Sequence, residues 1–360
     1  MARARLGPEF SLLVRCCHWN FASAEDQPPP EIPAKVDWDR LLTLARRHRV
    51  QGLAWNSLGQ TADHLPRHVK DALSSEARSI AATNLAIAAE CGRLRQRFEE
   101  AKTPLLFIKG LSVGALAYRS PLLKMAWDID LLIDPSDLGA ASKLLTDCGY
   151  VVRIPANLAD LEAWHGRSKE SVWHRQDSFF VEVHTRLSDN QRLIPAIDIH
   201  SPRQVVEVVP GVSLPTLADD ELLAYLAVHG ASSAWFRLKW ISDFAALIDG
   251  RTGEEIERLH RRSLDLGAAR ASAQALLLAD SLFGVLRSAP ELRMQLSKEW
   301  ETQLLCRAAL RMMTEIEGEP AEQPLGTMAI HWSQLLLKPG LTYKFSEIWR
   351  QGSSLLSRSH

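Results

Sequence analysis

The stretch FIKGLSVGALAYRSPLLKMAWDIDLLID, residues 107–134, decides the fold of the region around it. It places two aspartates, Asp128 and Asp130, one residue apart inside an apolar run. Burying a carboxylate among isoleucine, leucine and tryptophan side chains costs free energy unless a charged or hydrogen-bonding partner replaces the lost water. The stretch therefore raises the question of what lies opposite these two carboxylates.

Alternation within residues 125–133 predicts a β-strand with two different faces. Side chains of a strand point alternately to opposite sides of the sheet, so Asp128 and Asp130 share one face while Trp127, Ile129 and Leu131 point into the core. The two aspartates lie about 7 Å apart along the strand, at a rise of about 3.3 Å per residue. Like charges repel at that distance unless a cation lies between them, and Mg²⁺ prefers carboxylate, phosphate and water oxygens.

A later stretch, SFFVEVHTRL at residues 178–187, predicts a second strand that supplies a third carboxylate. Glu182 alternates with Val181 and Val183 and shares its face with His184. If this strand lies beside the first one, the three carboxylates converge on one place, and such a site suits two metal ions that activate a hydroxyl and stabilise phosphoryl transfer. His184 is then a candidate contact for nucleotide or acceptor, or else a structural histidine hydrogen-bonded to the sheet.

The residues upstream of the two aspartates predict a phosphate site. Lys109 and Gly110 end a short buried strand expected at residues 104–110, and a helix is expected to begin directly after the glycine. Free backbone N–H groups near Gly110, Leu111 and Ser112 then face outward at a helix N-terminus, which attracts phosphate. Lys109 adds a positive charge beside them. The alternative for Gly110 is a simple turn glycine.

Together these residues resemble a known family. A glycine and a serine after a strand, an Asp-x-Asp strand and a third acid on a later strand form the pattern of polymerase-beta-type nucleotidyltransferases. More narrowly, the motifs FIKGLSVGALAY, DIDLLID, VEVHTRL and HGASSAWFRLKWISDFAALI resemble an uncharacterised bacterial nucleotidyltransferase family with a Lys-Gly, Asp-Ile-Asp and Glu-x-His signature. The resemblance extends over residues 38–250.

The resemblance implies roles for individual residues. Asp128, Asp130 and Glu182 are expected to be catalytic and to bind Mg²⁺ or Mn²⁺, and Gly110 and Ser112 to hold the triphosphate of an NTP. The sequence departs from the superfamily at this point, because its usual Gly-Ser or Gly-Gly-Ser is Gly-Leu-Ser here.

Four further cationic or acidic positions follow from the same resemblance. Lys124 stands where relatives often carry an arginine, so it supplies charge for a phosphate but not the two-pronged guanidinium. Arg237, Lys239 and Asp243 are candidates for closing the nucleotide cleft. Lys239 and Asp243 are also four residues apart on an expected helix, which makes a surface ion pair the alternative.

The pattern of the whole chain predicts an α+β protein with a small mixed β-sheet of the nucleotidyltransferase type, flanked by helical regions on both sides. We expect an N-terminal segment with a proline-rich linker at 1–35, a helical region at 36–102, the α+β core at 103–215, a C-terminal helical region at 216–337 and a basic tail at 338–360.

Within the core we expect helices at 111–118 and 135–149, a strand at 150–154, a less regular segment rich in tryptophan, histidine and charge, and a hairpin at 205–217. Thr216 and Asp219 fit a capping box at the start of the next helix. Trp127, Trp164 and Trp173 are candidates for stacking on a base, with packing in the core as the alternative.

Composition narrows the partners and the location. Lys and Arg number 42 against 43 Asp and Glu, a formal net charge of −1, which disfavours long nucleic acid as a substrate without excluding a local basic groove. The five cysteines form no CxxC pair, as is typical of a reducing cytosol, and no apolar stretch reaches the ~20 residues of a membrane span. We therefore expect a cytoplasmic protein without a membrane partner.

The expected reaction is metal-dependent transfer of a nucleoside monophosphate from an NTP, by default ATP, to an acceptor hydroxyl or phosphate, with release of pyrophosphate. The acceptor is expected to be a small molecule, a sugar or a peptide rather than nucleic acid. Two alternatives stay open: a kinase that transfers the γ-phosphate on the same scaffold, and a non-catalytic module that binds nucleotide or a protein partner. Retention of all three carboxylates argues against the second.

Overall fold

The computed structural model describes residues 6–22, 27–176, 179–316, 318–323 and 325–357. The chain divides into two compact units. One, here called the helical unit, is built from the chain up to Ala77 and from Leu223 onward. The other, here called the sheet unit, is the continuous segment Arg78–Leu222. The five-part division expected from the sequence stays a prediction about domain organisation.

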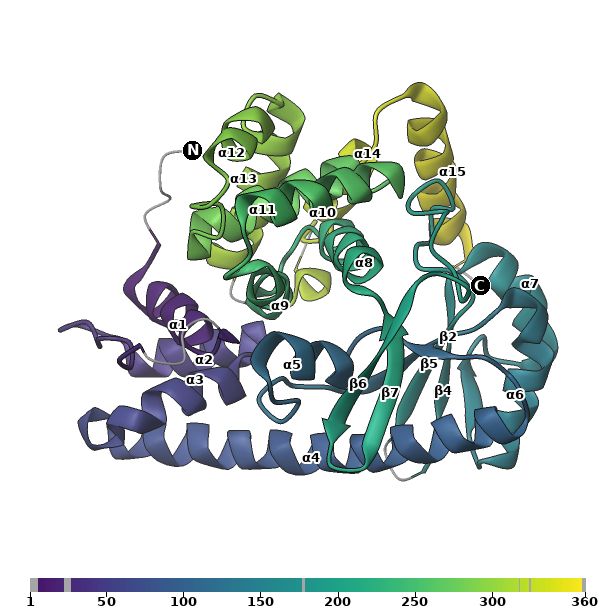
Figure 1. Ribbon diagram of the computed structural model, residues 1–360, viewed down its shortest axis with the longest axis horizontal. Helices are drawn as coiled ribbons and strands as arrows, with labels where there is room; N and C mark the ends of the chain where they lie inside the picture. The colour runs from purple at the N-terminus through teal and green to yellow at the C-terminus, as the bar shows by residue number, and fades with distance from the viewer. Residues whose placement is uncertain (1–5, 23–26, 177–178, 317, 324, 358–360) are drawn as a thin grey trace. The chain divides into compact units, whose positions relative to one another are not determined.

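The helical unit joins helices from the two ends of the chain (Figure 1). Its elements are α1 (Pro8–Trp19), α2 (Trp38–His48), α3 (Gln51–Leu58), the 3₁₀ helix η2 (Gly59–His64), the start of α4 (Arg67–Glu100), most of α8 (Asp219–Ser232), α9 (Leu238–Ile248), α10 (Gly253–Asp265), α11 (Ala269–Phe283), α12 (Pro290–Leu296), α13 (Trp300–Thr314), η5 (Pro320–Glu322), α14 (Met328–Leu336) and α15 (Leu341–Ser357).

Helix caps explain where several of these helices begin. The Asp37 side chain accepts a hydrogen bond from the Arg40 backbone N–H at 3.0 Å and so starts α2. Thr252 and Glu255 form a reciprocal capping box at the start of α10. Helix α11 packs against α9, α10 and α13, and α1 contacts both α9 and α11. Among the described residues, no helix combines the length and the apolar character of a membrane span.

The sheet unit contains all the strands that the structure describes. Its elements are the remainder of α4, β1 (Leu106–Phe107), α5 (Leu111–Tyr118), β2 (Asp128–Leu132), η3 (Pro135–Asp137), α6 (Leu138–Asp147), β3 (Val151–Ile154), η4 (Leu158–Asp160), α7 (Leu161–Arg167), β4 (Glu170–His174), β5 (Phe180–His184), β6 (Arg203–Val209), β7 (Val212–Leu217) and the first residues of α8.

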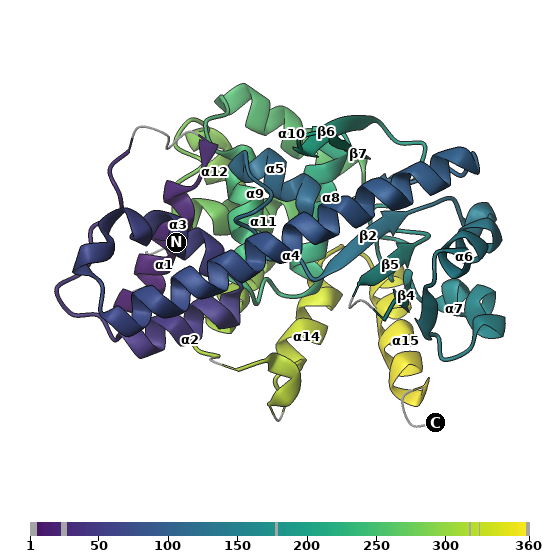
Figure 2. The same ribbon diagram turned by 90° about the horizontal axis from the view of Figure 1, so that it is seen from below.

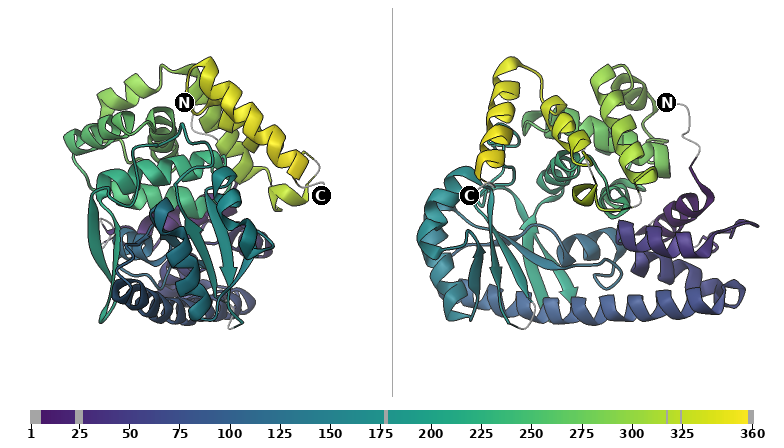
Figure 3. Two further views of the ribbon diagram at one scale, coloured as in Figure 1. Left: turned by 90° about the vertical axis from the view of Figure 1, so that its right-hand side faces the viewer. Right: turned by 180° about the vertical axis from the view of Figure 1, so that it is seen from behind.

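Five strands form a mixed sheet in the order β1-β2-β5-β4-β3. Figure 3 shows the protein from two further sides. Strands β2 and β5 are parallel, and the other neighbouring pairs are antiparallel. Strands β6 and β7 form the expected hairpin, with β7 beside β1 and β6 beside α5. The α+β class and the small mixed sheet with flanking helices are therefore confirmed.

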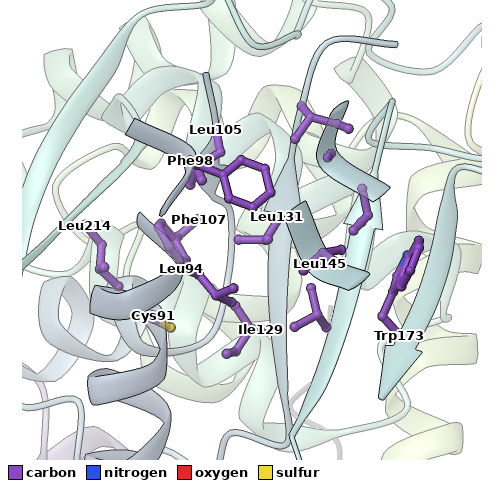
Figure 4. Packing of buried hydrophobic residues seen from close by; sticks show 14 of the residues in the cluster. Cys91, Leu94, Phe98, Leu105, Phe107, Ile129, Leu131, Leu145, Trp173 and Leu214 are labelled. Atoms are coloured by element: carbon purple, nitrogen blue, oxygen red, sulfur yellow. The ribbon is translucent and has the colours of Figure 1, made fainter. Parts of the chain in front are cut away.

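The core of the sheet unit lies between one face of the sheet and two helices. Ile129 and Leu131 of β2 pack with Leu94 and Phe98 of α4 and with Leu145 of α6 (Figure 4). The C-terminal half of α4 runs along this face (Figure 2). Because strand side chains alternate, the residues between these apolar ones face the opposite side of the sheet, and they include Asp130.

Three local expectations are wrong. Trp127 is 59% exposed rather than buried, because it precedes the first residue of β2 and escapes the alternation of the strand. Trp173 cannot stack on a base, since it is 1% exposed in the core and its indole N–H donates to the Ser171 hydroxyl at 3.0 Å. Thr216 caps no helix, because it lies inside β7 and α8 begins only at Asp219.

Parts of three segments expected from the sequence, at the two chain ends and at the second strand, fall on residues that the structure does not describe. Helix α1 lies within the stretch expected as an N-terminal segment with a proline-rich linker, and α15 lies within the stretch expected as a basic tail. Residues 1–5, 23–26 and 358–360 of those two segments lie outside the described residues, as does Ser178 at the start of the expected second strand.

Candidate functional site

The parallel pairing of β2 and β5 brings the acidic residues together. In its register Asp130 lies opposite Glu182, and Leu132 lies opposite His184. Asp130, Glu182 and His184 each offer one ligand atom, and these three atoms lie within 4.8 Å of one another. The two strands are therefore adjacent, as predicted, and they bring Asp130 and Glu182 together on the face opposite the apolar core.

Lys109 answers the question of what neutralises the buried carboxylate. Its ammonium nitrogen lies 2.7 Å from Asp130 Oδ1 and 3.9 Å from Glu182 Oε2. The Asp130 side chain is 1% exposed. Burial alone would raise the pKa of Asp130, but the charge of Lys109 and the hydrogen bond from His184 outweigh it and hold the pKa of Asp130 well below its ordinary value.

His184 is fully buried between three carboxylates. Its Nε2 lies 3.1 Å from Asp130 Oδ1 and 3.6 Å from Glu182 Oε2, and its Nδ1 lies 3.4 Å from Glu170 Oε2. Burial opposes the charged imidazolium, yet the bonds to Asp130 and Glu182 prevail and raise the pKa of His184. His184 thus belongs to the acidic cluster, and it does so by direct contact with two of the expected metal ligands.

The pKa of Glu182 is shifted in the opposite direction to that of Asp130. Its side chain is 22% exposed, and burial followed by repulsion from the Asp130 carboxylate raises its pKa, despite the hydrogen bond with His184. Two neighbouring carboxylates whose pKa values move apart are suited to different tasks, one as a permanent anion and the other as a proton acceptor.

Glu170 is a site residue that the sequence reasoning missed. It lies on β4, opposite His184 in the β4–β5 register, and pairs with the neighbouring Lys169 ammonium. Burial would raise the pKa of Glu170, but Lys169 and then His184 lower it. The available signal was weak, because the stretch ESVWH is only five residues long and its polar and apolar residues do not alternate, although burial alternates along the strand.

Gly110 places the start of α5 beside the acidic cluster. It is the N-cap of α5, with φ of +67°, and a Cβ added to it would lie 3.8 Å from the Asp128 carbonyl oxygen. The Ser112 side chain is fully buried, and its hydroxyl has no hydrogen-bond partner among the described residues. The Leu111 side chain packs in the core, so a nucleotide could meet Leu111 only through its backbone.

Not every predicted site residue joins the cluster. Within the described part of the chain, Asp128 is not one of the residues whose ligand atoms lie within 4.8 Å of one another, although it is half-buried at the start of β2. Lys124 is buried, and its backbone carbonyl accepts a hydrogen bond from Asn84 at 2.7 Å. The metal role of Asp128 and the phosphate role of Lys124 stay predictions.

The candidates from the last motif lie in the helical unit. Lys239 and Asp243 are both on α9, and Asp243 is 3% exposed. Asp243 is therefore not part of a solvent-exposed ion pair on the surface. Their proposed contact with nucleotide stays a prediction.

The donor set suits a divalent cation. Two carboxylates and one imidazole converge on one place, and all three groups are ligands that proteins offer to divalent metals. The nearby ammonium of Lys109 shows that this place already favours a positive charge. The residues therefore fit a metal ion held by Asp130, Glu182 and His184.

A mixed sheet that presents an acidic cluster beside a glycine-led helix is the arrangement expected of a nucleotidyltransferase. The model of a family described as uncharacterised nucleotidyltransferase matches residues 34–284. This match spans more than half of the chain, and the chain belongs to that family. No curated protein matches the chain significantly. Family membership makes the chain a transferase and implies a nucleoside triphosphate substrate.

Proposed function

We propose that the protein transfers a nucleoside monophosphate from ATP to a hydroxyl or phosphate of an acceptor and releases pyrophosphate. The observation that carries the proposal is the pairing of Asp130 with Glu182 across two parallel strands, with His184 and Lys109 in direct contact. The family match supports the same reaction class.

Asp130, Glu182 and His184 would hold the metal ion, with Asp128 as a further ligand at the edge of the cluster. When bound, a divalent cation supplies positive charge that activates the acceptor and stabilises the charge on the transferred phosphoryl group. Mg²⁺ and Mn²⁺ both accept carboxylate ligands, but Mg²⁺ prefers oxygen ligands throughout, so the imidazole of His184 favours Mn²⁺.

Different residues of the chain would accept the proton and bind the phosphates during the transfer. An acceptor oxygen bonds to the α-phosphorus, the bond from that phosphorus to the β-bridging oxygen breaks, and pyrophosphate leaves. Glu182 accepts the acceptor proton, a task that its raised pKa suits. Lys109 and the backbone N–H groups at Gly110 and Ser112 bind the phosphates, because a helix N-terminus and an ammonium both attract anions.

The acceptor is proposed to be a small molecule, a sugar or a peptide. A formal net charge of −1 provides no general attraction for long nucleic acid. A cytoplasmic location agrees with all five cysteines being free thiols, since disulfides are rare in that compartment.

The test is transfer of label from α- and γ-labelled ATP, in parallel, with Mg²⁺ or Mn²⁺ and a lysate that supplies acceptors. Asp130→Asn keeps the shape of the side chain and removes its charge, so α-label transfer should fall by about a thousandfold or more. Asp147→Asn, an exposed aspartate on α6, is the matched control and should retain transfer.

Each other outcome contradicts the proposal in a recognisable way. Label transferred from the γ position alone would identify a kinase. Nucleotide binding without transfer of either label would identify a binding module. Equal α-label transfer by the Asp130→Asn variant and the unmodified protein would remove Asp130 from the catalytic site.

A further inference from the structure

The helical unit contains a buried arginine whose guanidinium has no hydrogen-bonded anion among the described residues. Arg47, in the last turn of α2, is 7% exposed. Its three guanidinium nitrogens are each buried and have no hydrogen-bond partner among the described residues. A buried, unpaired guanidinium is among the most costly groups that a folded protein can contain. Such a group in a native fold needs an explanation, and a missing anion is the simplest one.

The surroundings of Arg47 increase the positive charge. The guanidinium of Arg237 donates to the Arg47 carbonyl oxygen at 3.3 Å, and both guanidinium groups lie over the ring of Phe236, at 5.2 and 5.1 Å from its centroid. Burial, with Arg49 as a further nearby cation, lowers the pKa of Arg47, and the same causes lower that of Arg237 to about 10. Two planar cations on one aromatic ring form a platform for a shared anion.

One carboxylate partly compensates for these charges. Both oxygens of Glu319 lie 2.8 Å from Nη2 of Arg237, and the Glu319 side chain is 36% exposed. The guanidinium groups of Arg47 and Arg237 both feel the charge of this single carboxylate. Among the described residues, the Glu319 side chain forms hydrogen bonds with Arg237 and none with Arg47, so the Arg47 guanidinium has no hydrogen-bond partner there.

We propose that Arg47 and Arg237 form a binding site for a phosphate-like oxyanion, and that the Glu319 carboxylate occupies the place of that anion in the ligand-free protein. Guanidinium groups match phosphate with two parallel hydrogen bonds, and a dianion balances the cluster better than one carboxylate does. None of the residues of this proposed site belongs to the acidic cluster of the sheet unit, although the family resemblance also makes Arg237 a candidate for closing the nucleotide cleft.

The experiment measures binding of inorganic phosphate by calorimetry in the full chain, with EDTA present and chloride at matched ionic strength. Arg47→Met keeps the apolar contact with Phe236 and removes the donors, so the affinity for phosphate should fall by about tenfold or more. Arg46→Met is the matched control, since Arg46 precedes it on α2 and forms a surface ion pair with Glu76. This variant should bind phosphate like the unmodified protein.

A second variant tests the competing carboxylate. Glu319→Gln removes the charge that the anion has to displace, so phosphate should bind several-fold more tightly. Pyrophosphate and ATP serve as separate probes, and tighter binding of either one through Arg47 extends the site to polyphosphates. Equal phosphate affinity in Arg47→Met and the unmodified protein, or no effect of Glu319→Gln, would overturn the proposal.

Discussion

At the scale of single residues, the contact between Lys109 and Asp130 keeps the buried Asp130 side chain ionised. A carboxylate that is 1% exposed is stable as an anion only beside a cation, and the Lys109 ammonium at 2.7 Å is that cation. The same ammonium lies near Glu182, where a metal ion would lie too. Lys109 and a divalent metal ion therefore compete for the same carboxylates.

Lys109→Met separates these two effects. Without metal, the variant removes the ammonium and leaves the buried Asp130 charge with His184 as its partner, so the free energy of unfolding should fall by about 3 kcal/mol. Added Mn²⁺ should stabilise the variant more than the unmodified protein, because the competing ammonium is absent. Thermal unfolding in EDTA measures the loss of stability, and thermal unfolding in Mn²⁺ measures the stabilisation by metal. Lys143→Met, at an exposed position on α6, is the control. Identical unfolding of the two variants in EDTA would show that Lys109 does not stabilise Asp130.

Local periodicity explains which site residues the sequence could predict. Asp130 and Glu182 were predictable because each lies within a run of alternating apolar residues, and one shared face follows from the geometry of a strand. The Lys109–Asp130 contact could not be predicted. The alternation of side chains along one strand does not indicate which side chain from a neighbouring segment will contact it. Glu170 was missed because β4 is short and carries Lys169 and His174 at its ends.

At the scale of elements, the junction between β1 and α5 is where we propose that the phosphates bind. Gly110 has φ of +67°, a region that strains any residue with a Cβ, and the chain can turn there directly from strand to helix. The sequence predicted both the strand end and the helix start, because glycine after an apolar run is a strong local signal.

Gly110→Ala should destabilise the protein by about 1–3 kcal/mol through backbone strain alone, because its φ of +67° and ψ of −122° lie outside the regions open to alanine. An added Cβ would lie 3.8 Å from its nearest neighbour, the Asp128 carbonyl oxygen, so no steric clash contributes. Gly139→Ala on α6 is the matched change: nothing lies within 4 Å of its Cβ, and helix propensity should make it slightly stabilising. Urea unfolding of both variants provides the comparison, and equal stability of Gly110→Ala and the unmodified protein would rule out the strain.

At the scale of the whole molecule, buried histidines link folding to pH. Burial lowers the pKa of His48 to about 3 and those of His165 and His260 to about 4. Below pH 6.5 these side chains take up protons in the unfolded chain but not in the folded one, so stability is lost as the pH falls from 6.5 toward 4. His184, whose pKa is raised, acts in the opposite direction.

Each of the three histidines should cost about 2 kcal/mol of stability at pH 5. The midpoint of thermal unfolding should therefore fall steadily between pH 7 and pH 5. His260→Gln should flatten this dependence, whereas His64→Gln, at an exposed position, should not. A midpoint that stays constant over this range would contradict the assignment of these histidines as neutral.

The division of the chain into a continuous and a discontinuous unit has a consequence during synthesis. The sheet unit is complete when the ribosome has released Leu222, whereas the helical unit then has only its first part. Helix α1 buries Leu12 and Leu13 and contacts α9 and α11, which are made much later. At about 5–20 residues per second, the apolar face of α1 waits on the order of ten seconds for these partners. During this interval only α2 and α3, among the described elements, can cover α1, so the part of its apolar face that packs on α9 and α11 stays exposed while the complete sheet unit is already outside the ribosome, and a chaperone would act on that face.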